Sequence, residues 1–518
     1  MEKCPASIFN DVIGPVMRGQ SSSHVAGAAR ICSLIRMGTN GAIRRAVVDF
    51  DVNGSLAESH DGHGSDMGMA SGLLGFDLTD PRVPGAMELA KEAGLDIQIN
   101  ILDYGAVHPN NYRIAITSDK GETRVWEAIS TGGGMVEVQR YENIPLAIAG
   151  DYHELLATSP DPAVLADVES LVPSREHCFR ADNGSLYCVN IKTTSAVPDE
   201  ILAAIRRLDG VRDVVRLAPV LPTGSRADCR VPFSSGAELL EYLKGGAREM
   251  WELAALYESS RGGVTEQQVF KHMAELVDIF QGAVRQGLAG TNYEQRILGP
   301  QAHLIDKSLQ AKAIPQSAIL TNVIRNITAI METKSSMGVI VAAPTVGSAG
   351  CLPGTVIGVA EALGLDQDAV TRGMLAAGLI GVFFCEGASF AAEVGGCQFE
   401  CGAAGGMAAA GVAQMLGGTA EQCLDAASMA LQAITGLACD PVANRVEVPC
   451  LGKNVMAGTN AVSCAMVALA GYDRVIPLDE TITAIYDIGL KLPLELRCTY
   501  GGLGKTPASQ TIRKRLDG

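Results

Sequence analysis

The chain has 518 residues and a formal net charge of −16, and 47% of its residues are apolar while 5% are aromatic. This length is enough for two to four domains with a large buried core. The acidic balance, without a basic tail or a long block of charge, excludes nucleic acid as the main partner, because phosphate binding needs clustered Lys and Arg.

Neither a targeting segment nor a membrane segment is indicated. The N-terminal stretch MEKCPASIFNDVIGPV lacks the apolar core of a signal peptide. The most apolar run, residues 338–365, is interrupted by Pro344, Pro353 and several glycines, so we do not expect it to cross a membrane. We therefore expect a soluble cytoplasmic protein without a membrane partner.

Residues 1–150 are expected to form an α/β domain. Stretches rich in Val and Ile alternate there with helical patterns that end at Gly. The predicted strands are residues 44–56 and 95–104, and the predicted helices are residues 23–38 and 84–94.

Residues 151–235 are expected to form a small connecting or regulatory module. A strand at 185–194, a helix at 198–210 and a strand at 211–221 make one βαβ unit, and we expect its arrangement to be ACT-like.

Residues 236–518 carry helical spacing, and we expect an all-helical domain that holds the catalytic chemistry. Asp366 and Thr419 are the expected N-caps of two of its helices. Gly- and Pro-containing loops separate the helices and hold the unusual residues. The predicted helices are residues 236–259, 265–287, 366–384, 419–437 and 478–492. The predicted fold class is thus an α/β N-terminal domain, a small βαβ module and a mostly α-helical C-terminal domain.

The chain contains 14 cysteines, but no paired CxxC motifs of the kind that form a zinc ribbon. In a reducing compartment most of these thiols are small buried hydrophobic groups. Cys397, Cys439 and Cys450 differ, because each lies at a helix edge or in a loop whose backbone amides can stabilise a thiolate or inorganic sulfur. Three thiolates would leave one iron of a four-iron cluster open to substrate. On spacing alone, three buried structural thiols are the simpler interpretation.

Six stretches of the sequence carry a resemblance to a known family. They are GPVMRGQSSSHVAG (14–27), GHGSD (62–66), HPNN (108–111), AAPTVGSAGCLPG (342–354), GGCQFECGAAGGMAAAG (395–411) and CDPVANRVEVPCLGKN (439–454). Together they resemble the motifs of the iron–sulfur-dependent L-serine dehydratases, in a form that fuses what some members carry as separate β and α subunits. The match covers both ends of the chain and leaves residues 151–235 unassigned.

The resemblance implies that Cys397, Cys439 and Cys450 bind a [4Fe–4S] cluster. Cys401 stands where the family usually has an apolar residue, so we expect it to lie beside the cluster or to be inert. The resemblance leaves Cys351, Cys385 and Cys498 as structural thiols.

The hydroxyl-rich loop Ser21, Ser22, Ser23 runs into the helix predicted at 23–38. Such a loop either caps the helix or, with the helix N-terminus, binds a carboxylate. His24 either packs there or contacts the substrate. The resemblance favours substrate binding for the serines and a catalytic contact for His24.

A second polar loop contains His63, which we expect to be the proton-transfer residue, because a histidine near its ordinary pKa can remove or deliver a proton. Asp66 is expected to orient it, whereas His60 is better interpreted as part of a solvated turn. His108 and Asn110 are expected to bind the substrate carboxylate or amine, with an ordinary loop turn as the alternative.

Thr345 and Ser348 in the C-terminal domain, and Lys453 and Asn454 after the last motif cysteine, complete the expected substrate site. Lys453 stands where the family commonly has Arg, and the two cations bind carboxylates differently. Val346 and Phe399 also depart from the smaller or polar residues common in the family, which bears on the substrate.

Three functions remain open from the sequence. The first is β-elimination and deamination of L-serine to pyruvate and ammonia by a [4Fe–4S] lyase. The second is a related lyase that acts on another small acid such as L-cysteine. The third is a non-catalytic iron–sulfur sensor, which would not need His63 or the hydroxyl loop. We expect a small-molecule substrate and a homodimer.

Overall fold

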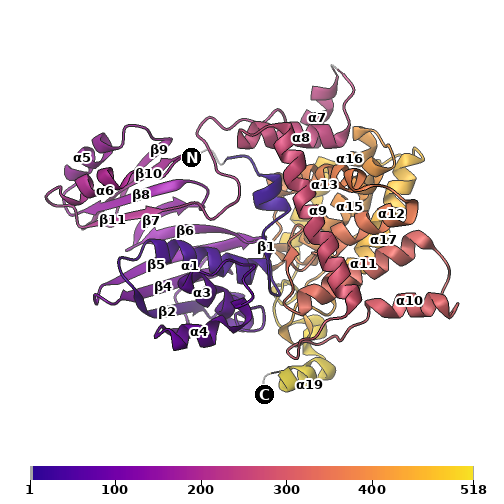
Figure 1. The fold of residues 1–518 in the computed structure, drawn as a ribbon, viewed down its shortest axis with the longest axis horizontal. Coiled ribbons are helices and arrows are strands. Elements are labelled where there is room, and N and C mark those ends of the chain that lie inside the picture. The colour runs from indigo at the N-terminus through magenta and orange to yellow at the C-terminus, as the bar shows by residue number, and fades with distance from the viewer. Residues whose placement is uncertain (1–3, 245, 517–518) are drawn as a thin grey trace. The chain divides into compact units, whose positions relative to one another are not determined.

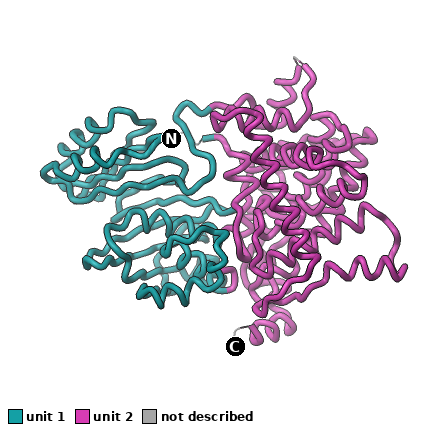
Figure 2. Tube along the Cα trace, viewed as in Figure 1, with its two compact units in different colours: residues 1–4, 24–61, 65–229 teal, residues 5–23, 62–64, 230–518 magenta. Residues whose placement is uncertain are grey.

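The computed structural model describes residues 4–244 and 246–516, shown in Figure 1. Contacts along the chain divide it into two compact units, which Figure 2 shows in separate colours. Unit 1 comprises residues 1–4, 24–61 and 65–229, and unit 2 comprises residues 5–23, 62–64 and 230–518. This division does not separate residues 1–150 from 151–229, so the three-domain organisation stays a prediction.

Unit 1 contains a six-stranded sheet with the strand order β3-β2-β4-β5-β6-β7, in which only β2 and β3 are parallel. Alternate residues of β2, such as Ala46, Val48 and Phe50, are fully buried, because successive side chains of a strand point to opposite faces. The strands are β2 (Ile43–Asp51), β3 (Asp96–Leu102), β4 (Asn111–Ser118), β5 (Thr123–Gly132), β6 (Met135–Tyr141) and β7 (Ile144–Ile148). The predicted strands 44–56 and 95–104 are confirmed as β2 and β3.

Helices pack on this sheet. Helix α1 contacts α3 and strands β5 and β6, while α4 contacts α3 and β3. The helices of this layer are α1 (Gly27–Met37), α2 (Leu56–Ser59), α3 (Ser65–Leu74) and α4 (Ala86–Glu92), preceded by the π-helical turn η2 (Ser22–Ala26). The predicted helices 23–38 and 84–94 are confirmed as α1 and α4.

A second, four-stranded antiparallel sheet of unit 1 has the order β11-β8-β10-β9. Its elements follow the βαββαβ sequence of the ferredoxin-like fold. They are β8 (His153–Ser159), α5 (Val164–Leu171), β9 (His177–Asp182), β10 (Tyr187–Thr193), α6 (Asp199–Arg206) and β11 (Asp213–Leu217). The predicted βαβ unit is confirmed as the last three elements, whereas β8, α5 and β9 were not predicted. The ACT-like assignment of this module stays a prediction.

Unit 2 is mostly helical (Figure 1). Helix α15 lies at its centre, where it contacts α12, α13, α16 and α17. Its helices are α7 (Gly236–Leu243), α8 (Met250–Gly262), α9 (Glu266–Ala289), α10 (Ala302–Gln310), α11 (Ala318–Ser335), α12 (Cys351–Leu363), α13 (Gln367–Gly387), α14 (Ala392–Gly395), α15 (Cys401–Met415), α16 (Ala420–Ala433), α17 (Cys450–Leu469), α18 (Leu478–Lys491) and α19 (Pro507–Leu516).

The N-caps predicted for two of these helices are confirmed. The Asp366 side chain accepts a hydrogen bond from the Ala369 amide, and Thr419 forms a capping box with Gln422. The helix predicted at 236–259 is two helices, α7 and α8. The expectation of an all-helical domain is wrong in one detail, because β12 (Ile340–Val341) pairs with β1 (Val16–Met17), a strand from the N-terminal segment.

Helix α13 is the one helix of the described chain that is long and apolar enough to cross a membrane. However, 78% of its apolar window is buried within the structure. It contacts α8, α9 and α15. Such burial is typical of the core helix of a soluble protein. The apolar run at 338–365 forms no helix of this kind, since it holds β12 and the shorter helix α12.

Candidate functional site

The three motif cysteines are buried at the starts or ends of elements in unit 2. Cys397 opens the turn η4 (Cys397–Phe399) directly after Gly396, whose φ of 78° favours glycine. Cys450 is the first residue of α17, and Cys439 lies in a loop, where it forms an isolated bridge with Arg497. Their exposed fractions are 2% for Cys397 and 5% for the other two. Two of these thiols therefore lie at helix edges and the third in a loop, as expected.

The thiols of these cysteines interact with one another and with neighbouring groups. A hydrogen bond from the Cys401 thiol lowers the pKa of Cys397 to about 7, despite its burial. A hydrogen bond with Cys498, together with burial, raises the pKa of Cys439 above its ordinary value. Burial raises the pKa of Cys450, and Cys397 and Cys439 raise it further. Cys397 contributes to the raised pKa of both Cys439 and Cys450, which indicates that the three sulfur atoms lie close enough to influence one another.

This donor set fits an iron–sulfur cluster. Soft, buried thiols are the ligands that such clusters use, and Cys397 and Cys439 share an apolar cluster with the small side chains of Ala392, Ala404 and Ala457. Among the described residues, no group of three or more His, Cys, Asp or Glu side chains is arranged to hold a single metal ion. The thiolates of a cluster bind different irons, so they need not converge on one point.

Lys453 and Asn454 connect the segments that carry the cysteines. The Lys453 ammonium donates to the Ala438 carbonyl at 2.6 Å and to the Asp440 carboxylate at 2.8 Å, on both sides of Cys439. The Asn454 amide nitrogen donates to the carbonyls of Gly347 and Cys450, each at 2.8 Å. These contacts favour a positioning role for both side chains, and their predicted substrate contacts stay a prediction.

The hydroxyl loop and the Thr345 loop, more than 300 residues apart in sequence, meet in unit 2. The Ser22 hydroxyl accepts a hydrogen bond from the Val346 amide at 3.2 Å. Within the two loops, Ser21 lies 3.2 Å from Ser23 and Thr345 lies 3.1 Å from Ser348, measured between their hydroxyl oxygens. All these hydroxyl side chains are buried.

Helix α1 has Ala26 as its N-cap and no side-chain cap, but it continues the turn η2, which begins at Ser22. Both the capping interpretation and the carboxylate site therefore stay predictions for the hydroxyl loop.

His63 also belongs to unit 2, together with Gly62 and Gly64, although the residues on either side of these three belong to unit 1. A Cβ at Gly62 would lie 2.5 Å from the Asn444 carbonyl oxygen, and Arg445 donates to the Gly62 carbonyl at 3.2 Å. The tip of this loop thus packs against the segment between Cys439 and Cys450. His63 is fully buried there.

The other predicted polar residues belong to unit 1. His24 Nε2 lies 2.8 Å from the Ser59 hydroxyl. Asn110 is 1% exposed, and its backbone N–H donates to His108 Nδ1 at 3.1 Å. The hydroxyl of Ser55 donates to the Asn110 side-chain carbonyl.

Asp66 contacts a different histidine from the one expected. Its carboxylate lies 2.7 Å from His60 Nδ1, so His60 is a partly buried, paired residue rather than part of a solvated turn. Attraction by Asp66 outweighs burial and raises the pKa of His60. The orienting role of Asp66 toward His63 stays a prediction. The hydrogen bond of Asp66 to His60 does not favour it.

Two charged residues near the cysteines were missed from the sequence. Loss of solvation, with the nearby charges of Cys397 and Glu393, raises the pKa of Glu400 to about 8. Lys334 is fully buried, its ammonium donates to the Val446 carbonyl, and burial lowers its pKa. Glu400 lies within the GGCQFECG motif, so its position between two cysteines was a usable signal, whereas Lys334 had none.

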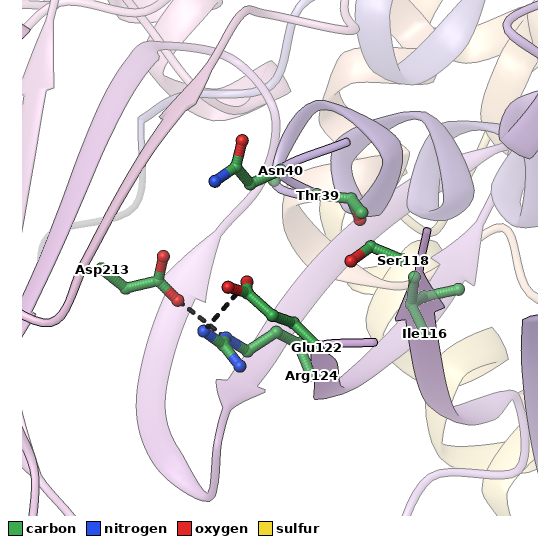
Figure 3. A pocket seen from close by; sticks show the side chains of 8 residues that line it. Thr39, Asn40, Ile116, Ser118, Glu122, Arg124 and Asp213 are labelled. Carbon is green, nitrogen blue, oxygen red and sulfur yellow. Dashed lines mark hydrogen bonds and ion pairs between the residues drawn. The ribbon is translucent and has the colours of Figure 1, made fainter. Parts of the chain in front are cut away.

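A shallow pocket of unit 1 contains none of the predicted site residues (Figure 3). Its cavity has a volume of about 10 Å³, which is about the space that one water molecule needs. Arg124 lies there between Asp213 and Glu122, at 2.7 and 3.5 Å. This pocket is an ion-paired hollow of unit 1, and no cysteine lines it.

Comparisons with known proteins agree with the motifs. A family model described as "Serine dehydratase alpha chain" matches residues 195–503, more than half of the chain. The "Probable L-serine dehydratase, alpha chain" of Bacillus subtilis (strain 168) is 35% identical over 287 residues, 55% of this chain and 96% of that protein. The "Probable L-serine dehydratase, beta chain" of the same organism is 35% identical over 219 residues, 41% of this chain and 98% of that protein.

A relative whose name specifies neither an alpha nor a beta chain also matches. The "L-serine dehydratase 1" of Escherichia coli (strain K12) is 31% identical over 281 residues, 52% of this chain and 61% of that protein. These matches define an enzyme of the lyase class. The chain belongs to the iron–sulfur-dependent L-serine dehydratase family, in the form that joins β-like and α-like parts in one polypeptide.

Proposed function

We propose that the protein converts L-serine to pyruvate and ammonia by β-elimination. The observation that carries this proposal is the meeting, within unit 2, of the hydroxyl loop with the Thr345 loop, in a unit that also holds three interacting buried thiols. The names of the relatives, which are L-serine dehydratases, support the choice of substrate.

Cys397, Cys439 and Cys450 would hold a [4Fe–4S] cluster, and their burial and mutual interaction support this assignment. When bound, such a cluster supplies a Lewis acid for the substrate hydroxyl. Lys453 and Asn454 keep the cysteine-bearing segments in register through their hydrogen bonds to Ala438, Asp440 and Cys450. The protein itself therefore contributes ligands and a rigid frame around them.

The substrate carboxylate would bind at the hydroxyl loop and the Thr345 loop, where Ser22 and the Val346 amide already lie in contact. His63 would accept the Cα proton, since a buried imidazole near the cysteine-bearing segment is suited to proton transfer. The substrate contacts expected of His24, His108 and Asn110, which belong to unit 1, stay predictions. Loss of the β-hydroxyl as water gives an enamine, which tautomerises to an imine and is hydrolysed to pyruvate and ammonia.

L-Cysteine remains the alternative substrate. Of the two residues that suggested it, Val346 and Phe399, the second is explained by packing. The Phe399 ring is fully buried, stacks on Tyr486 at 5.9 Å and contacts Phe384 at 6.1 Å between ring centroids. A Cβ at Gly395 or Gly489 would collide with this ring, at 2.1 and 2.6 Å. Phe399 therefore packs between helices. Of the two residues, only Val346 still indicates a less polar substrate site.

Anaerobic turnover with a panel of small amino acids tests the proposal. We expect equal amounts of pyruvate and ammonia from L-serine, at a higher kcat/KM than for L-cysteine or L-threonine. A higher kcat/KM for L-cysteine, with release of sulfide, would replace the first choice by the second. Tight iron binding without turnover of any substrate would favour the sensor hypothesis instead.

We also propose a cytoplasmic homodimer. Large apolar side chains are exposed on and after α17, including Met466 at 60%, Tyr472 at 64% and Val475 at 74%. Covering such side chains is a common reason for association. Light scattering coupled to gel filtration measures the mass directly, and a monomer at micromolar concentration would contradict the proposal.

A further inference from the structure

An α-amino acid brings an ammonium group into the site together with its carboxylate. The polar residues proposed in unit 2 are hydroxyls, an imidazole, an ammonium and an amide, and none of them carries a negative charge. A buried cation needs an anionic partner, because removing it from water without one is costly. The proposed site is therefore incomplete without a carboxylate.

Glu400 lies where such a carboxylate is needed. A Cβ at Gly347, in the Thr345 loop, would lie 2.9 Å from both Glu400 carboxylate oxygens, so this glycine leaves the room that the carboxylate fills. The Thr345 hydroxyl hydrogen-bonds to the same carboxylate. The Glu400 amide donates to the Cys397 carbonyl at 3.1 Å. Glu400 thus joins the Thr345 loop to the turn of the first cysteine.

The Glu400 carboxyl group forms no ion pair. Within the described chain, no Lys, Arg or His nitrogen lies within 4.0 Å of its carboxyl oxygens. Lys334, a buried cation of the same unit, donates instead to the Val446 carbonyl. A bound ammonium group would therefore be the ionic partner of Glu400.

We propose that Glu400 binds the ammonium group of the amino-acid substrate. The inference rests on the proposed function, whose substrate class it specifies as α-amino acids rather than hydroxy acids. Glu393 has a different role, because its Oε1 accepts a hydrogen bond from the Ser23 hydroxyl at 3.0 Å. It is a positioning residue for the hydroxyl loop.

The test compares L-serine with glycerate, which keeps the carboxylate and the β-hydroxyl but has a hydroxyl in place of the ammonium group. Wild-type turnover of the amino-acid panel is measured first, so a failure of the proposed function is seen before any variant is made. In Glu400→Gln we expect kcat/KM for the preferred amino acid to fall roughly 10- to 100-fold, the range of a charge-assisted hydrogen bond. The inhibition constant of glycerate should stay unchanged.

Iron content and the visible spectrum of the loaded protein provide a readout besides activity, and both should match the wild type. Glu258→Gln is the matched control, because Glu258 is a buried carboxylate of unit 2 held by Ser7 and the Ile8 amide. It should leave the ratio of amino-acid to glycerate affinity unchanged. Equal losses for both ligands in Glu400→Gln, or no loss for either, would overturn the proposal.

If Glu400→Gln does not fold or load iron, Gly347→Ala gives the same answer by another route. The added methyl group would displace the carboxylate without changing its charge. We expect Gly347→Ala to weaken the binding of the amino acid more than the binding of glycerate. An equal loss of affinity for both ligands would count against the proposal.

Discussion

Cys397 and Cys401 are four residues apart and in contact, but we expect only the first to bind iron. Cys401 is the donor in the hydrogen bond that lowers the pKa of Cys397, and its sulfur lies 3.4 Å from the Asn454 amide nitrogen. These contacts make Cys401 a neighbour of the proposed cluster.

Alanine variants of Cys397, Cys439 and Cys450 should each lose the cluster. The proposed site has three thiolate ligands, and each variant removes one of them. Anaerobically reconstituted wild type should hold about four irons per chain, the content of one cubane. Iron and sulfide assays measure this loss. Cys401→Ala is the control and should retain the cluster; full iron content in Cys439→Ala would show that the ligands are assigned wrongly.

His63→Asn should keep the cluster and lose turnover by about 100-fold or more, the usual contribution of a general base. The reason is that His63 is fully buried and follows Gly62, which packs against the segment between Cys439 and Cys450. Exchange of the substrate Cα proton with deuterated solvent should vanish in the variant. His60→Asn is the control from the same loop, since His60 pairs with Asp66 in unit 1. Unchanged exchange in His63→Asn would move the base to another residue.

The sequence predicts the cysteines and hydroxyls of the site better than its charges. Motif cysteines and serine runs are recognisable in one dimension, whereas the role of Glu400 depends on its approach to Gly347, 53 positions earlier in the chain. Lys334 lies in an ordinary helix, and only the fold reveals that its ammonium is buried. The pairing of Asp66 with His60 was not predicted, because two histidines in one loop cannot be distinguished by spacing.

At the scale of elements, close helix contacts explain the small residues of the second half of the chain. A Cβ at Gly411 of α15 would lie 2.8 Å from the Gly373 carbonyl oxygen of α13. Gly411→Ala should therefore destabilise unit 2 by about 1–3 kcal/mol, the usual cost of overpacking. Urea unfolding measures this change.

Gly282→Ala is the matched control for this prediction. Gly282 lies inside α9, where an added Cβ would meet only the Arg285 side chain at 3.8 Å. Alanine should stabilise that helix by about 0.5–1 kcal/mol, because it restricts the unfolded chain. Equal effects of the two substitutions would show that the α13–α15 contact is looser than described.

The four-stranded sheet of unit 1 contains a buried carboxylate that should make its stability depend on pH. Burial raises the pKa of Glu154 to about 7, although Lys192 lies 3.3 Å away and Asn190 donates to it at 2.7 Å. Between its usual pKa and this value the unfolded chain has lost the proton and the folded protein has kept it. Stability therefore falls as pH rises through this window.

Glu154→Gln cannot ionise, so its Tm relative to the wild type should rise between about pH 5 and pH 8. Thermal unfolding followed by circular dichroism at several pH values measures this slope. A constant offset between the two proteins would mean that Glu154 ionises at its ordinary pKa in the folded state.

The elements that the sequence predicted have clear boundaries. Helices α13 and α16 begin at capping residues, and β2 alternates buried and partly buried side chains from Ala46 to Phe50. The ends of helix α15 could not be predicted from the sequence. Its residues from Cys401 to Gln414 are all buried, and a helix that is apolar on every side shows no hydrophobic periodicity. The pairing of β1 with β12 could not be predicted, since two-residue strands distant in sequence leave no local signal.

At the scale of the whole molecule, the N-terminal segment 5–23 belongs to the unit formed by residues 230–518. The Ser7 hydroxyl and the Ile8 amide donate to the buried Glu258 carboxylate at 2.5 and 2.8 Å. Val16 pairs with Val341, and Tyr257 donates to the Ala6 carbonyl at 2.8 Å. Without this segment, Glu258 would be a buried charge whose hydrogen bonds are lost, which is strongly destabilising.

Co-expressed fragments 1–229 and 230–518 should therefore associate and co-purify, because the first fragment supplies a segment that completes the fold of the second. Fragment 230–518 alone should be insoluble or unfold at a lower temperature, whereas adding residues 5–23 to it through a flexible linker should restore a cooperative transition. Differential scanning fluorimetry and iron content of the three preparations measure these effects. The matched control replaces Ser7 by Ala in the linked fragment, which removes one donor to Glu258 and should cost about 1–3 kcal/mol. A fully stable, iron-loaded fragment 230–518 would show that the N-terminal segment only lies on unit 2 without supporting it.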